Sequence, residues 1–213
     1  MEAIKNTSCV INRPGGFIIT DTAFSFCSFT KNAKILDLGC GSGATVEYLH
    51  HKYGFDVYGL DKKLELSDIP NNLFKAAAEV IPFPEISMDG VLMECSFSMM
   101  TNQKTVLKEC NRVLKADGRL IISDMYARGE AAQLKGCLGR VDSKESIINI
   151  IESNGFTIEL FEDFSQHLQT MWGQMIFEKG AKTFYCDLGV DPETMKRIKC
   201  GYYLIVASKK VAL

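Results

Sequence analysis

Residues 35–43 place one carboxylate and three glycines at the point where a strand gives way to a helix. The segment reads Ile-Leu-Asp-Leu-Gly-Cys-Gly-Ser-Gly, with Asp37 inside an apolar run and glycines at positions 39, 41 and 43. A strand, a glycine turn and a helix bring backbone N–H groups and a helix N-terminus up to a ligand. Glycines suit such a turn because a Cβ would block close approach and because the turn often needs positive φ. The segment therefore predicts a cofactor site.

The glycine spacing alone leaves two kinds of cofactor open. Residues 39–44 satisfy the G-x-G-x-x-G/A fingerprint of dinucleotide-binding proteins, and Asp61 lies about twenty residues further on, where a carboxylate binds ribose hydroxyls. Asp37 discriminates between the two, because a carboxylate just before the turn repels a pyrophosphate but attracts an ammonium group. S-adenosylmethionine carries an ammonium and a sulfonium but no phosphate. The sequence favours this cofactor over NAD.

The elements that must hold these residues alternate between strands and helices. We expect strands at 33–38, 55–60, 73–77, 89–95, 119–123, 156–161 and 202–207, and helices at 22–29, 44–53, 101–114, 144–152, 164–178 and 192–198. Thr20 or Asp21 is the expected N-cap of the first helix. This alternation predicts an α/β fold with a mostly parallel sheet. Ligands bind such sheets at the carboxyl ends of the strands, which here carry Asp37, Asp61, Glu94 and Asp124.

Several segments in order resemble the class I S-adenosylmethionine-dependent methyltransferases. Residues 35–43 are similar to the first motif of the family, 58–61 (Tyr-Gly-Leu-Asp) to its second-strand acidic motif, and 78–83 (Ala-Glu-Val-Ile-Pro-Phe) to its A-E-x-L-P-F segment. Residues 89–92 and 112–120 resemble two later motifs, so the resemblance covers most of residues 30–126. It implies a Rossmann-like, seven-stranded, mostly parallel sheet with helices on both faces. The implied activity is methyl transfer from S-adenosylmethionine to a small-molecule acceptor by in-line displacement.

The resemblance also implies roles for individual residues. The backbone of Gly39, Cys40 and Gly41 would pack against the methionine portion and the ribose, and Asp37 would orient the amino group. The ribose hydroxyls would bind Asp61, and the remaining cofactor contacts would come from Lys62, Ala78, Glu79, Glu94 and Cys95.

One position departs from the family pattern. Ala77 stands where the family usually has an Asp that accepts the adenine amino group. We expect Glu79 or a backbone carbonyl to substitute for it.

Methyl transfer from a sulfonium depends mainly on alignment, and a general base is needed only if the acceptor must lose a proton. Glu94 is the candidate general base. The alternative is that Glu94 only binds the cofactor. Candidate acceptor contacts are Arg13, in a possible flap formed by residues 1–30, and Asp124, Tyr126 and Arg128. The long connection 163–199 is the expected lid, since the sheet does not require it. We expect no metal site.

The composition predicts one domain over residues 1–213 in a reducing, cytoplasmic setting. The net charge of −2 gives no electrostatic footprint for nucleic acid or an anionic membrane. The sequence has no secretory signal, and no apolar run approaches the ~20 residues that cross a bilayer. None of the eight cysteines forms a Cys-x-x-Cys pair. The oligomeric state and the acceptor are not predicted.

Two other functions stay open from the sequence. The first is a methyltransferase that acts on a thiol, arsenic or another soft atom and uses Cys95, Cys137 or Cys186. Ala77 is the hint for a protein that binds S-adenosylmethionine without transferring its methyl group.

Overall fold

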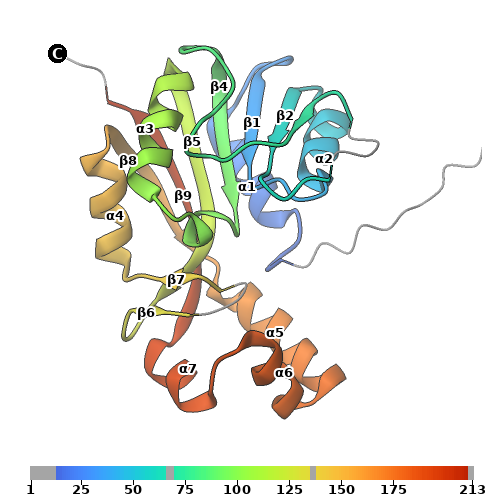
Figure 1. Ribbon diagram of the computed structural model, residues 1–213, viewed down its shortest axis with the longest axis vertical. Helices are drawn as coiled ribbons and strands as arrows, with labels where there is room; N and C mark the ends of the chain where they lie inside the picture. Colours follow the sequence, from blue (N-terminus) through green and yellow to red (C-terminus); the bar gives the residue numbers. More distant parts are fainter. Residues whose placement is uncertain (1–12, 66–69, 135–137, 211–213) are drawn as a thin grey trace, which may run out of the picture.

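A seven-stranded sheet forms the centre of the computed structural model, which describes residues 13–65, 70–134 and 138–210 (Figure 1). The strand order is β3-β2-β1-β4-β5-β9-β8, with the first five strands parallel and β9 antiparallel to both of its neighbours. The strands are β1 (Lys34–Leu38), β2 (Asp56–Leu60), β3 (Leu73–Phe74), β4 (Met88–Glu94), β5 (Leu114–Ala127), β8 (Phe156–Asp163) and β9 (Cys200–Lys209). The predicted mostly parallel, seven-stranded sheet is confirmed. Cys9, Cys137 and the first twelve residues of the predicted flap lie outside the described residues.

Helices cover both faces of the sheet, as predicted. Helices α1 (Ile18–Cys27) and α2 (Ala44–Tyr53) pack on one face, and α3 (Gln103–Val113) and α4 (Lys144–Ser153) pack on the other. Successive strand side chains point to opposite faces, so Leu92 joins the first apolar cluster, whereas Val91 joins the second. Both clusters are continuous hydrophobic cores, which is typical of a sheet buried on both sides.

The start of α1 differs from the prediction, and the difference has a physical reason. We expected a helix over 22–29 with Thr20 or Asp21 as its N-cap, whereas α1 begins at Ile18 and its N-cap residue makes no side-chain capping bond. The Asp21 carboxylate instead accepts hydrogen bonds from Tyr48, Tyr53 and Lys52. These contacts hold α1 against α2, so the residue serves tertiary packing rather than capping.

The connection 163–199 forms three helices beyond one end of the sheet (Figure 1). They are α5 (Ser165–Lys179), α6 (Ala181–Leu188) and α7 (Pro192–Ile198). We predicted only two, because Gly180 separates α5 from α6 through a backbone φ of 80° rather than through a long loop. A two-stranded hairpin, β6 (Ala132–Gln133) with β7 (Arg140–Val141), was also missed because two residues are too few to show a hydrophobic period.

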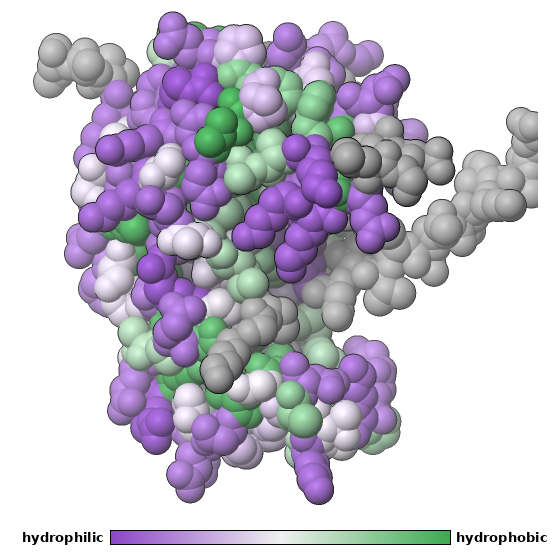
Figure 2. All heavy atoms as spheres, viewed as in Figure 1, coloured by the Kyte–Doolittle hydropathy of each residue, from purple (hydrophilic) through white to green (hydrophobic). Residues whose placement is uncertain are grey.

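Hydrophilic residues dominate the face seen in Figure 2, and apolar surface gathers in the lower part of that view, where β6 and β7 lie in Figure 1. Partly buried apolar side chains of this region include Leu134, Met171, Trp172 and Met175. Within the described ranges, no helix is both long and apolar enough to span a bilayer.

The fold depends on the apolar face of α3, which gives a direct stability prediction. Leu107 is fully buried in the second core cluster, whereas the adjacent Lys108 is exposed. Leu107→Ala removes buried methyl groups and leaves a cavity, so we expect the free energy of unfolding to fall by about 2–5 kcal/mol. Lys108→Ala should change it by less than about 0.5 kcal/mol. Urea denaturation of both variants measures the difference, and equal midpoints would contradict this packing.

Candidate functional site

The glycine loop after β1 is a backbone cradle. The Gly39 N–H donates to the Leu60 carbonyl at 2.7 Å, which fastens the loop to the end of β2. Gly39 has a φ of 82°, and a Cβ there would lie 2.6 Å from the Ser96 Cβ. No atom lies within 4 Å of the place where Gly41 would carry a Cβ. Helix α2 then begins without a side-chain cap. The loop thus presents an open backbone and a helix N-terminus to a ligand.

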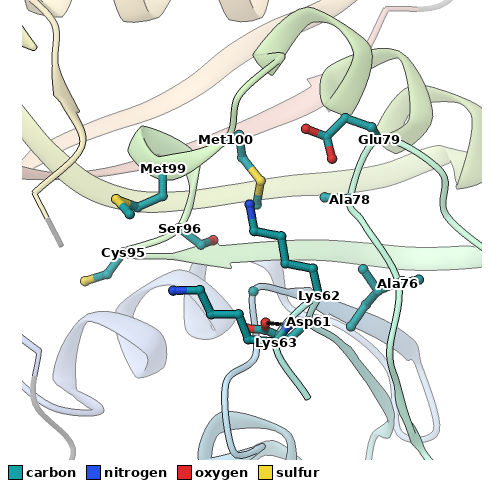
Figure 3. Close-up of a pocket in the computed structure, with 12 residues that line it drawn as sticks. Asp61, Lys62, Lys63, Ala76, Ala78, Glu79, Cys95, Ser96, Met99 and Met100 are labelled. Carbon is teal, nitrogen blue, oxygen red and sulfur yellow. Dashed lines mark hydrogen bonds between the residues drawn. The ribbon is translucent and has the colours of Figure 1, made fainter. Parts of the chain in front are cut away.

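Two cavities meet at this loop. The first, of about 240 Å³, lies along the ends of β2 and β4, and its lining includes Asp61, Lys62, Ala78, Glu79, Met99 and Met100 (Figure 3). The second, of about 300 Å³, lies on the α2 side and is lined by Arg13, Asp37, Gly41, Thr45 and Glu94 among others. Gly39 and Cys95 line both cavities. An elongated ligand with its middle at these two residues would fill both.

Asp61 follows β2 and holds the loop in place. Its two carboxylate oxygens accept hydrogen bonds from the N–H groups of Gly41 at 3.0 Å and Lys63 at 2.8 Å. A carboxylate has about four lone-pair positions, so further hydrogen bonds remain possible on the cavity side. This arrangement suits a ligand that offers two hydroxyl groups.

Asp37 is the most unusual group of the second cavity. Its residue is 3% exposed and lines the cavity, and the charges of Glu94, Arg13 and Asp61 act on its carboxyl group. Burial and the nearby Glu94 carboxylate raise the pKa of Asp37 to about 8, although the Arg13 charge opposes this shift. Burying a carboxylate is costly unless its charge is paired and hydrogen-bonded. The cavity therefore favours a cationic group at this point.

Glu94 and Arg13 form a buried ion pair beside Asp37. The Glu94 carboxylate also accepts hydrogen bonds from Thr20 at 2.7 Å and Thr45 at 3.1 Å. Burial raises the pKa of Glu94, and the Arg13 charge works against that effect. Its two oxygens accept three hydrogen bonds in all, which leaves about one lone-pair position open. The contact with Arg13 fastens the N-terminal segment to the end of β4, and a role for Glu94 as general base stays an untested prediction.

The two cysteines of the site differ in their surroundings. The Cys40 side chain packs over Gly59, where an added Cβ would lie 2.7 Å from its Sγ. Only the backbone position of Cys40 therefore serves the cavity. Cys95 is exposed to solvent at the cavity junction and has a φ of 52°, which is uncommon for a residue other than glycine.

The adenine side of the first cavity contains the predicted residues. Ala78 is buried, and Lys62 and Glu79 line the same space (Figure 3). The Ala77 carbonyl accepts a hydrogen bond from the Val80 N–H at 3.0 Å, and Ala77 is not among the residues that line this cavity. Glu79 does line it, so its carboxylate is the group available in place of the absent Asp.

The predicted acceptor contacts other than Arg13 lie outside both cavities. Asp124 is 2% exposed and accepts hydrogen bonds from the N–H groups of Ser98 and Met125, which fixes the short 3-10 helix η1 (Phe97–Met99). The Tyr126 hydroxyl donates to Asp163, and the Arg128 guanidinium donates to the Lys199 carbonyl. Their contacts are structural, and an acceptor role for them stays an untested prediction.

Several residues of the site were not predicted. Met99 and Met100 follow β4 closely, so their place in the sequence was a usable signal. Thr20 and Thr45 gave no such signal, because only the folded chain brings them to Glu94. Among the described residues there is no group of three or more His, Cys, Asp or Glu side chains arranged to hold a metal ion.

These features match the groups of S-adenosylmethionine. The carboxylate of Asp61 suits the ribose, the buried carboxyl group of Asp37 suits the ammonium, and the open backbone at Gly41 admits a ligand closely. The adenosine would occupy the first cavity and the amino-acid portion the second.

Comparisons with known proteins agree with this geometry. Residues 36–122 match the family model described as a methyltransferase domain. The chain is 25% identical over 186 residues to the sarcosine/dimethylglycine N-methyltransferase of Halorhodospira halochloris, covering 78% of this chain and 67% of that protein. It is 31% identical over 99 residues to the demethylmenaquinone methyltransferase of Thermotoga maritima, covering 43% of each protein.

A solved structure extends the likeness to the fold. It is the geranyl diphosphate C-methyltransferase of Streptomyces coelicolor A3(2) in complex with Mg²⁺, geranyl diphosphate and S-adenosyl-L-homocysteine. It superposes with a TM-score of 0.74 at 14% identity, covering 89% of this chain and 77% of that one. The ordered motifs and these comparisons lead to one conclusion: residues 36–122 form a methyltransferase domain, and the chain has the fold of the class I S-adenosylmethionine-dependent methyltransferases.

Proposed function

We propose that the two cavities together bind S-adenosylmethionine and that this chain moves its methyl group to a small-molecule acceptor. The observation that carries the proposal is the meeting of the two cavities at Gly39 and Cys95, with the Asp61 carboxylate in the first cavity and the buried Asp37 carboxyl group in the second. The relatives named above are methyltransferases whose names refer to small molecules, which supports the same class of acceptor. Free cysteines at six described positions support a reducing, cytoplasmic setting.

Each part of the cofactor has a partner in this chain. Asp61 accepts the ribose hydroxyls while its N–H contacts keep the glycine loop in position. Asp37 receives the ammonium group, which supplies a positive charge and hydrogen-bond donors to its buried carboxyl group. Arg13 and the N-terminus of α2 lie on the same cavity and favour the carboxylate group. Burial of both charges with matched partners gives orientation as well as affinity.

The reaction that S-adenosylmethionine supplies is displacement of a methyl group from a sulfonium by an acceptor atom. The chain contributes alignment, because the backbone at Gly39 and the wall after β4 fix the point between the cavities. Glu94 acts in this account by holding Arg13 and the N-terminal segment, not by removing a proton. The acceptor would then be a group that is nucleophilic without help from Glu94, such as a neutral amine.

The N-terminal turn and the helices after β8 are placed to cover the site. A Cβ on Gly15 would lie 2.9 Å from the His167 ring, so this turn packs directly on α5. We infer that residues 13–30 act as a flap and residues 163–199 as a lid that meet over the second cavity. Their contact would exclude water from the transfer point, which strengthens electrostatic interactions there.

The two other functions are separated by activity measurements. Formation of S-adenosylhomocysteine with any member of a panel of amines, phenols and thiols would support methyl transfer. Tight cofactor binding with no product across that panel would favour the binding-only function. The soft-atom function has little support from geometry, because Cys95 lines the cavities but Cys186 does not. Unchanged turnover in a Cys→Ser variant at both positions and at Cys137 would exclude it.

Asp61 gives the first test of cofactor binding. Asp61→Ala removes a carboxylate that accepts charge-assisted hydrogen bonds, so we expect the Kd for S-adenosylmethionine to rise by about 10- to 100-fold. Glu65→Ala is the matched control, because that carboxylate is exposed four residues further on and lines neither cavity. Titration calorimetry measures both variants. If Asp61→Ala bound S-adenosylmethionine with the affinity of the wild-type chain, the proposed contact between Asp61 and the ribose would be contradicted.

Asp37 gives a prediction about protons. Its pKa of about 8 means that the carboxyl group carries a proton in most molecules at neutral pH before the ligand binds. An ammonium ligand favours the charged carboxylate and lowers this pKa. Binding should therefore release a proton, and affinity should rise as the pH is raised from about 6 toward about 8.

Calorimetry in two buffers of different ionisation enthalpy measures this proton release. Asp37→Asn is the control, because it leaves Glu94, Arg13 and Asp61 in place while removing the titrating group. We expect the buffer dependence of the binding heat to be smaller in the variant. The same buffer dependence in both proteins would show that Asp37 does not receive the ammonium.

A further inference from the structure

Cys95 lies at the transfer point and in an uncommon backbone conformation. Within the described ranges, two residues line both cavities, namely Gly39 and Cys95. Cys95 therefore borders the place where the sulfonium would lie. Its φ of 52° turns the chain directly after β4, and the side chain projects toward the same side as Met99 (Figure 3). Positive φ at a non-glycine residue is a strain that proteins keep mainly at functional sites.

A buried tyrosine fixes the direction of the Cys95 thiol. The Tyr202 hydroxyl lies 3.0 Å from the Cys95 Sγ, and it also lies 3.2 Å from the Ser123 carbonyl and 3.3 Å from the Ser123 hydroxyl. A carbonyl oxygen only accepts, and it is a stronger acceptor than a thiol sulfur. The tyrosine hydrogen therefore points to Ser123, and the thiol hydrogen points to the tyrosine oxygen.

This direction determines what the thiol offers to a ligand. Its hydrogen is turned toward the Tyr202 hydroxyl on β9, so that contact does not use the sulfur lone pairs. The residue as a whole is exposed, but its sulfur lies against the buried Tyr202, and this desolvation together with the Asp124 charge raises the pKa of the thiol to about 12. The thiol therefore stays neutral beside a methyl donor. A neutral sulfur with free lone pairs attracts a cation and the polarised C–H groups of its methyl, and it does little for an uncharged thioether.

We infer that Cys95, oriented by Tyr202, makes the site prefer the methylated sulfonium form of the cofactor over the demethylated product. The inference rests on the proposed cofactor site and adds to it a residue that distinguishes substrate from product. Tyr202 is a positioning residue in this scheme, since it acts through Cys95. Its main chain also exchanges hydrogen bonds with Phe164 and Ser165, which links the same residue to the start of α5.

The test compares the Kd values of S-adenosylmethionine and S-adenosylhomocysteine by calorimetry, so it needs no acceptor. Cys95→Ala should weaken S-adenosylmethionine relative to S-adenosylhomocysteine by about two- to five-fold, as expected for loss of a weak contact. Cys95→Ser, which keeps a donor for Tyr202 and lone pairs for the ligand, should retain part of the preference. Tyr202→Phe should shift the ratio in the same direction, and it should add nothing in the Cys95→Ala background.

Two controls show whether a change in this ratio is specific. Asp61→Ala should weaken both ligands in the same proportion, because both carry the ribose. Cys186→Ala, at an exposed position on α6, should leave the ratio unchanged.

The outcomes separate this inference from the function on which it rests. Failure of the wild-type chain to bind either compound would overturn both. Binding of both compounds with an unchanged ratio in Cys95→Ala would overturn only the inference. If Cys95→Ala and Tyr202→Phe each change the ratio of the two Kd values and their effects multiply in the double variant, Tyr202 does not act through Cys95. That result would remove Tyr202 from the inference.

Discussion

The parallel pairing of β1 with β2 and β4 is the constraint on which the site depends. Its register places Asp37 level with Gly59 on one side and Leu92 on the other. Asp61 and Glu94, at the ends of the neighbouring strands, are thereby brought to the edge of the sheet where β1 ends. A shift of one residue in this pairing would turn one of these carboxylates into the opposite core cluster. The fold thus sets the positions of charges before any ligand binds.

Two buried carboxyl groups at that edge share a single cationic partner among the described residues. Asp37 and Glu94 are both buried there, and one guanidinium, from Arg13, is paired with Glu94. The protein holds the remaining carboxyl group at an energetic cost, which a cationic ligand reduces. This imbalance explains why an ammonium and a sulfonium group suit the site better than phosphates do. It also ties ligand binding to the N-terminal segment, because the same Arg13 fastens that segment to β4.

Sequence reasoning reached the central sheet and the cofactor cavities because both depend on local signals. Strand periodicity, the glycine turn and the carboxylates at strand ends lie within short segments, and Asp37 discriminated between cofactors by its charge alone. Contacts made across the sheet gave no such signal. The pairing of Arg13 with Glu94 joins residues 81 positions apart, and that of Cys95 with Tyr202 joins residues 107 apart. Asp124 was expected near the acceptor from its strand-end position, but its burial beneath η1 depends on packing that the pattern does not contain.

A crystal structure of the chain with S-adenosylhomocysteine tests the central claim most directly. We expect the ribose against Asp61, the ammonium against Asp37 and the sulfur between Gly39 and Cys95, with Arg13 still paired to Glu94. A ligand confined to one cavity, or one whose ribose lies away from Asp61, would contradict this account of the site.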